Sequence, residues 1–355
     1  MRLHRARLSM VTRRTHQGAS LTELLVGLLI GLVAVIVILG VFAGAEGVRR
    51  NTAGAAEAQQ TGTMMMHMLA TELGNAGNGL AAAASELGTC PDTGDIRTSL
   101  RPIPALITAG ATTDAPDSFV VNYAVAAALA APVAFAADAI AGAPLRIRSP
   151  LGFAAADRVA AISLTGNCAA TTVTSVSPPD PEGIVDVAHA GLAEGFARSS
   201  LLLNLGPRGR VQRVRYDVVD GTLRSLDLLT PGAVPNPLAS NIVTLKAQYG
   251  IDLDGDGFMD TWVAADRAPW TAASVLAAPA ATLVGIKAIR IGLIVKSEAY
   301  DRDQTRRFDW ALFDCADTDK ARCAGRLEGS LPARWRYRTY EISVPLRNSI
   351  WNAHP

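Results

Sequence analysis

Residues 17–44 have the sequence QGASLTELLVGLLIGLVAVIVILGVFAG, an apolar run with one acid, Glu23, near its start. No residue from Leu24 to Ala45 is charged. At about 1.5 Å per helical residue, this stretch matches the ~30 Å of a bilayer's hydrocarbon core. The sequence therefore predicts one transmembrane helix, and the organisation of the chain follows from it.

The segment before this helix is basic, because residues 1–18 contain five arginines and no acid. Positive residues beside a membrane helix favour the cytoplasmic side, so we expect the N-terminus inside and the residues after Glu46 outside. The alternatives are an ordinary signal anchor and a secretory signal peptide cleaved at the A-x-A-like residues 43–45. The uncharged core is longer than the roughly 7–15 residues usual in signal peptides.

Glu23 is the unusual feature of the apolar run. A carboxylate in a membrane segment is costly, and such groups are normally paired and functional. Cleavage after Gly18 would give Ala19 a new amine and make Glu23 the fifth residue of the mature helix. An amine and a carboxylate of neighbouring subunits would then neutralise each other.

The basic leader, Gly18, ASLTEL and the apolar helix together resemble the prepilin processing site of type IV pilins and type II secretion pseudopilins. The resemblance implies that a prepilin peptidase cuts after Gly18, that the new N-terminus at Ala19 is methylated, and that Glu23 guides subunit docking. The sequence departs from the family at Ala19, where phenylalanine is usual. The resemblance also implies a single-pass inner-membrane protein with a periplasmic domain that later enters an extracellular pilus.

The fold class that we predict is α+β and type IV pilin-like. Its long N-terminal helix spans the membrane in its first half and packs on an antiparallel β-sheet globular domain. Met65, Leu69 and Leu73 recur at helical spacing, so we expect the helix to continue beyond the membrane. Segments in which polar and apolar residues alternate follow the glycines after the helix, and we expect them to form strands. The predicted divisions are the leader 1–18, the transmembrane half 19–45, the amphipathic half 46–75 and the β-rich domain 76–355.

The sharpest polar motif is DLDGDGFMD at residues 252–260. Three aspartates occupy positions one, three and five of a calcium loop, glycine is at six, the Phe258 carbonyl is at seven, and Asp260 is at nine. Valine replaces the glutamate of position twelve. We therefore expect a weak calcium site, and the alternative is a hairpin turn that needs no metal. The ligands would be Asp252, Asp254, Asp256, Phe258 and Asp260.

The four cysteines form no C-x-x-C pair, which favours disulfides outside the cytoplasm over a zinc site. Cys315 and Cys323 flank a short polar loop and are the first candidates for a bridge. Cys90 and Cys168 are a possible second pair. Three connectivities remain open from the sequence alone.

The sequence contains no motif for catalysis. Its five histidines are scattered, and H-E-x-x-H, G-x-S-x-G, P-loop and Rossmann glycine patterns are absent. Outside the leader, acidic residues outnumber basic ones, which argues against nucleic acid as the main partner. We expect a protein that is not an enzyme.

A second resemblance lies in LKAQYGIDLDGDGFMDTWV, IKAIRIGLIVKS and YRTYEISVPLRNSIW, whose order and spacing are similar to those of PilW-type minor pilins. It implies incorporation at or near the pilus tip, a role in initiating assembly, and consequences for twitching and adhesion. The implied partners are other minor pilins, the major pilin, the prepilin peptidase, the inner-membrane assembly platform and a tip adhesin. The alternatives are a minor pseudopilin of type II secretion and a membrane-tethered, calcium-dependent binding module.

Overall fold

The computed structural model describes residues 20–78, 87–91, 93–124, 132–148, 152–207, 211–230, 232–300, 304–313 and 326–350. The chain divides into two compact units, residues 1–53 and 54–355. Helix α1, Leu21–Asn75, belongs to both units. Its residues up to 53 lie in the first unit, and its residues from 54 onward are the first element of the second.

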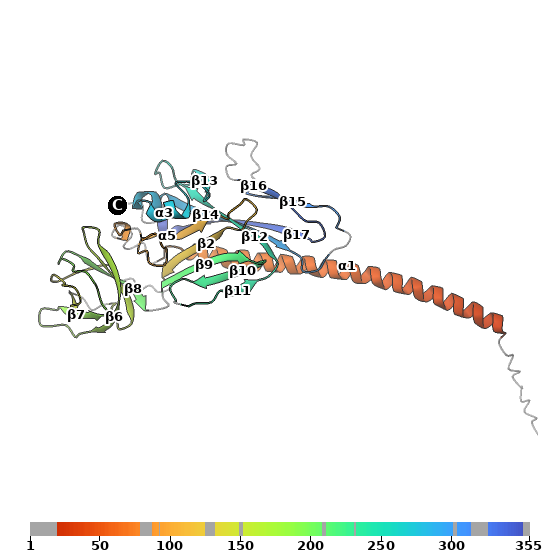
Figure 1. The fold of residues 1–355 in the computed structure, drawn as a ribbon, viewed down its shortest axis with the longest axis horizontal. Coiled ribbons are helices and arrows are strands. Elements are labelled where there is room, and N and C mark those ends of the chain that lie inside the picture. The colour runs from red at the N-terminus through yellow and green to blue at the C-terminus, as the bar shows by residue number, and fades with distance from the viewer. Residues whose placement is uncertain are drawn as a thin grey trace, which may run out of the picture. The chain divides into compact units, whose positions relative to one another are not determined.

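Within the second unit, one face of α1 is part of the main hydrophobic core. Met65, Leu69 and Leu73 are buried, with exposed fractions of 4, 0 and 0%. They pack with residues of the five-stranded and the four-stranded sheets described below. The helix ends before Gly77, whose φ of +76° suits glycine. The helical spacing and the glycine stop expected from the sequence are both present. Helix α1 is the long helix of Figure 1.

The first sheet has the order β1-β2-β9-β10-β11. Its strands are β1 (Ala105–Thr108), β2 (Ser118–Ala124), β9 (Val211–Val219), β10 (Thr222–Asp227) and β11 (Asn236–Ala239). Asp220 and Gly221 join β9 to β10 with positive φ at both residues, as a type I′ turn requires. We call this sheet A.

The second sheet, sheet E, has the order β13-β12-β14-β17. Its strands are β12 (Ile242–Ile251), β13 (Thr261–Ala264), β14 (Ile286–Lys296) and β17 (Tyr337–Pro345), and helices α3 (Ala272–Ala277), α4 (Ala280–Val284) and α5 (Arg347–Ile350) accompany it. The hairpin of β15 (Phe308–Leu312) and β16 (Leu327–Leu331) packs Trp310 and Leu312 against Ile294. The Tyr340 hydroxyl on β17 donates to the Ala58 carbonyl of α1 at 3.2 Å.

A third body lies between β2 and β9 in the sequence, although these two strands pair directly. It has six strands in the order β3-β8-β5-β6-β7-β4, namely β3 (Val133–Ala134), β4 (Leu145–Ile147), β5 (Asp157–Ile162), β6 (Cys168–Val176), β7 (Val185–His189) and β8 (Leu201–Pro207). Immediately after β3, Phe135 forms a bridge with Ile147 of β4. This bridge closes the sheet, so we call residues 133–207 the barrel.

The barrel has its own apolar interior, to which Phe135, Ile147, Val159, Val187 and Leu202 contribute. Closure removes the free edges that an inserted open sheet would leave. Strands β6, β7 and β8 are grouped together in Figure 1. The predicted α+β class, with a long N-terminal helix and antiparallel sheets, is confirmed.

Candidate functional site

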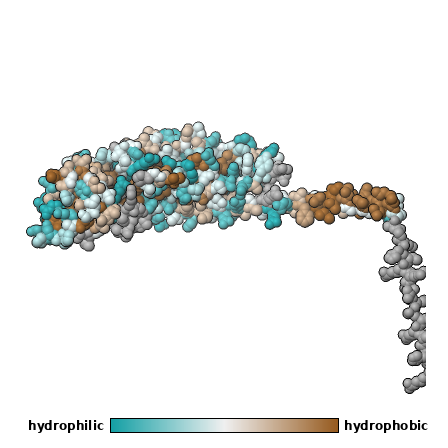
Figure 2. All heavy atoms as spheres, turned by 60° about the horizontal axis from the view of Figure 1, so that its bottom comes forward, coloured by the Kyte–Doolittle hydropathy of each residue, from teal (hydrophilic) through white to brown (hydrophobic). Residues whose placement is uncertain are grey.

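The first part of α1 is the one helix, among the described residues, that is long and apolar enough to cross a membrane. Its large side chains from Leu21 to Phe42 are each more than half exposed. The visible face of this segment is apolar along its length (Figure 2). Such a surface suits lipid or the apolar helices of other subunits.

Glu23 lies in the first turn of this helix. The Ser20 Oγ accepts a hydrogen bond from the Glu23 N–H at 3.2 Å, and the Glu23 carboxylate accepts one from the Ser20 N–H at 3.4 Å. These reciprocal bonds form a capping box, which satisfies N–H groups that a helix start leaves free. Residues 20–23, S-L-T-E, have the S-x-x-E pattern of a capping box, which the sequence-based prediction did not include. Gly18 and Ala19, the predicted cleavage and methylation residues, lie outside the described residues.

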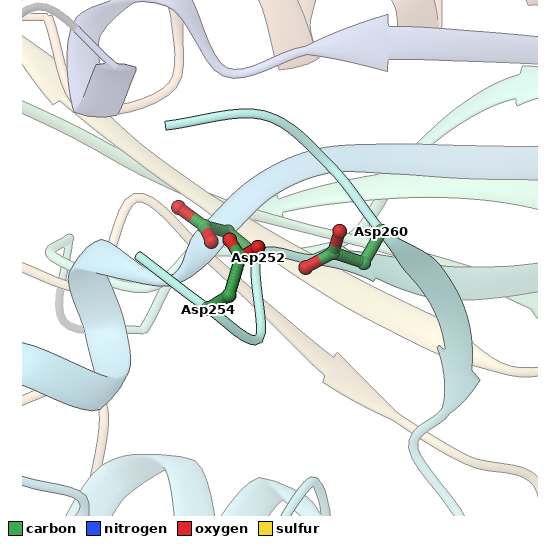
Figure 3. Close-up of side chains that lie close together, drawn as sticks. All are labelled: Asp252, Asp254 and Asp260. Carbon is green, nitrogen blue, oxygen red and sulfur yellow. The ribbon is translucent and has the colours of Figure 1, made fainter. Parts of the chain in front are cut away.

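The aspartate-rich loop joins β12 to β13, two paired strands of sheet E. The structure brings Asp252, Asp254 and Asp260 together, with one carboxylate oxygen of each within 4.8 Å of the others (Figure 3). Asp256 is not part of this group, and its carboxylate accepts the Phe258 N–H at 2.8 Å. Of the five predicted ligands, the structure therefore brings together the carboxylates of three. Oxygen ligands of this kind suit a hard cation such as calcium.

Backbone N–H groups organise the loop. The Asp252 carboxylate accepts the Gly255 N–H at 2.7 Å and the Gly257 N–H at 3.0 Å. The Asp260 carboxylate accepts the Leu253 N–H at 2.6 Å. These bonds give the loop its shape without a metal, because each carboxylate closes a local turn.

A lysine that the sequence analysis did not connect with the loop contacts Asp252. Lys287, on the neighbouring strand β14, places its Nζ 3.3 Å from the Asp252 Oδ2, and the two side chains are 4% and 3% exposed. Burial acts to raise the pKa of the Asp252 carboxyl. The N–H donors of Gly255 and Gly257 and the Lys287 ammonium outweigh burial and lower this pKa below its usual value.

Among the described cysteines, Cys90 and Cys168 form a disulfide. It joins the segment after α1 to β6 of the barrel. Cys90 packs with Leu87, Ala160, Ile162 and Leu203 in a small core on the barrel's outer face. The possible pair of the sequence analysis is thus confirmed, whereas Cys315 and Cys323 lie outside the described residues.

Comparison with known protein families gives a match over part of the chain. Residues 220–348 match the model of the PilW family, described as type IV pilus-assembly protein W. Over this range the chain is PilW-like. The predicted resemblance is confirmed there, and the matched range contains the aspartate-rich loop and sheet E but not the barrel.

Among solved structures, the chain is similar to the type IV-like pilin TTHA1219 from Thermus thermophilus. The identity is 10%, the match covers 82% of this chain and 97% of that one, and the TM-score is 0.37. No curated protein sequence matches the chain.

Proposed function

We propose that the protein is a minor pilin of the type IV pilus. The PilW-like segment at residues 220–348 carries this proposal, and the long apolar helix with Glu23 in its first turn supports it. The chain would be anchored in the inner membrane, with a cytoplasmic N-terminus and a periplasmic β-rich part, before it enters the pilus. Its role is structural rather than catalytic.

In this proposal, the protein lies at or near the pilus tip and helps to initiate assembly, with effects on twitching and adhesion. Its partners are the other minor pilins, the major pilin, the assembly platform and a tip adhesin. A deletion strain would lose surface pili and twitching while protein secretion continues. Normal piliation with lost secretion would favour the alternative, a type II secretion pseudopilin.

Processing by the prepilin peptidase is tested at the mature N-terminus. Mass spectrometry of the protein isolated from cells should find a chain that starts at Ala19 and carries one added methyl group. A chain that starts near Glu46 would contradict the proposal and favour an ordinary secreted or tethered binding module.

The docking role of Glu23 can be separated from its capping role. Glu23→Gln keeps an oxygen that accepts the Ser20 N–H but has no charge, whereas Glu23→Ala removes both. We expect both variants to be cleaved after Gly18 and both to be absent from sheared pili. Normal incorporation of Glu23→Gln would show that no ion pair with a neighbour's amine is needed.

We also propose that the aspartate-rich loop binds calcium weakly, with affinity on the order of 10⁻⁴–10⁻³ M. The three converging carboxylates support this proposal. The Lys287 ammonium opposes it, because a calcium ion would share Asp252 with a cation that is already in place. Removing that ammonium should therefore strengthen binding.

The measurement is the melting temperature of the full-length protein with and without millimolar calcium, with magnesium at equal ionic strength as the control. We expect a rise with calcium, no rise in Asp254→Ala, and a larger rise in Lys287→Gln. If neither the natural protein nor Lys287→Gln responds to calcium, the loop is a metal-free turn.

A further inference from the structure

The run MMMHM of α1, which begins at Met64, contains two differently placed sets of side chains. Met65 and Met66 are 4% and 7% exposed and belong to the main hydrophobic core. Met64 is 65% exposed, His67 is also exposed, and Met68 is half-buried against that core. Core packing therefore explains the two buried methionines, but it does not explain Met64 and His67.

Helix geometry brings the three outer side chains together. His67 and Met68 follow Met64 by three and four residues, and residues at these spacings are neighbours on a helix surface, with Cβ atoms about 5–6 Å apart. Methionine and aromatic-ring side chains on a helix lean toward its N-terminus. His67 and Met68 therefore both lean toward the turn that carries Met64. We call Met64, His67 and Met68 the thioether–imidazole triad.

The surface around the triad leaves the imidazole open to a ligand. Met64 and His67 line one shallow hollow on α1, together with Thr63. The Thr71 hydroxyl donates to the His67 carbonyl at 2.9 Å, and the Thr63 hydroxyl donates to the Gln59 carbonyl at 2.9 Å. Both hydroxyls are thus bonded to the helix backbone. In the described part of the chain, the imidazole of His67 has no hydrogen-bond partner.

The donor atoms of the triad are two thioether sulfurs and one imidazole nitrogen. Calcium requires oxygen ligands, and zinc sites are built from thiolates, imidazoles and carboxylates. Within the described residues, the group of His, Cys, Asp and Glu side chains that could share a metal ion is that of the aspartate-rich loop, and it does not include His67. Thioether sulfur instead favours Cu(I), and imidazole nitrogen is compatible with copper.

We propose that the thioether–imidazole triad binds one Cu(I) ion through the sulfurs of Met64 and Met68 and one ring nitrogen of His67. The ligands come from adjacent turns of one helix, so the bound ion would link these turns. A thioether loses no proton when it binds a metal, and so the two sulfurs need no neighbouring base. The proposal does not depend on incorporation into a pilus.

The test is equilibrium dialysis of the detergent-solubilised full-length protein against Cu(I) without oxygen, with copper measured by atomic absorption. The copper is supplied as its acetonitrile complex, so that no reductant reaches the Cys90–Cys168 disulfide. Cys315→Ser/Cys323→Ser is the background, because a free thiol would compete for the same ion. We expect the protein to bind one Cu(I) per chain, and X-ray absorption to show sulfur and nitrogen neighbours.

Three variants assign the copper to the triad. Met64→Leu and His67→Gln each remove one ligand at an exposed position, and each should weaken binding at least tenfold. Met66→Leu is the matched control, because Met66 lies in the same run but is buried in the core. This variant nearly conserves side-chain volume and should leave copper binding unchanged.

Met64 and His67 are both exposed, so their variants keep the test decisive even if Met68→Leu does not fold. Absence of Cu(I) uptake by the background protein would overturn the proposal. Uptake that Met64→Leu and His67→Gln leave unchanged would do the same, because the copper would then lie elsewhere on the chain. An equal uptake of Zn(II) that His67→Gln removes would also refute it, since selection by sulfur would then have no role.

Discussion

Removal of the Cys90–Cys168 disulfide should destabilise the protein strongly. The two residues are 78 positions apart, and a bridge of that span removes considerable entropy from the unfolded chain. The loop-closure relation gives about 4.5 kcal/mol at 25 °C for this separation. Domains of this kind are commonly stable by only about 5–15 kcal/mol, so the loss would be a large fraction of the total.

The double variant Cys90→Ala/Cys168→Ala tests this value better than a reductant, because it changes only these two of the four cysteines. Urea unfolding of the full-length protein in detergent, followed by circular dichroism, gives the free energy of unfolding. Each single variant should lose about as much as the double, since either one opens the loop. A loss below about 1 kcal/mol would refute the reasoning and show that barrel closure, not the bridge, holds the region.

Three other changes test the packing and the loop. Gly62→Ala should lower stability by about 1–3 kcal/mol despite alanine's helix preference, because its Cβ would overlap the Tyr340 ring; a higher melting temperature would contradict this. Tyr249→Phe removes the hydroxyl that accepts the buried Ile107 N–H at 2.6 Å, so urea unfolding should show a loss of about 1–3 kcal/mol. The lowered pKa of Asp252 contributes stability above the ordinary carboxyl pKa of about 3.9. This contribution is lost as pH falls through the folded value, so acid should narrow the stability gap between the natural protein and Asp252→Asn.

Local chemistry explains what the sequence predicts well. The apolar spacing of α1, the positive-φ turn at Asp220 and Gly221, and the long strands of sheet E each depend on neighbouring residues. The convergence of three loop aspartates follows from the same cause, since a short glycine-rich turn cannot keep them far apart.

The features that the sequence did not predict depend on distant contacts. Barrel closure needs the Phe135–Ile147 bridge, which joins the two ends of the strand order. The position of Lys287 under Asp252 follows from the pairing of β12 with β14, which a linear pattern does not specify. The Cys90–Cys168 pair is one of the pairings open from the sequence, and its selection depends on where the barrel packs.

Glu23 and Asp252 differ in how readily each can accept a new partner. The described bonds of the Glu23 side chain include one weak contact, 3.4 Å from the Ser20 N–H, at an exposed position. A neighbouring amine would replace this contact at little cost and gain a charge-assisted bond. The Asp252 side chain is buried with two short N–H donors and an ammonium. A metal ion at Asp252 must weaken bonds that already stabilise the fold. We therefore expect Glu23 to accept a neighbouring amine more readily than Asp252 accepts a metal ion.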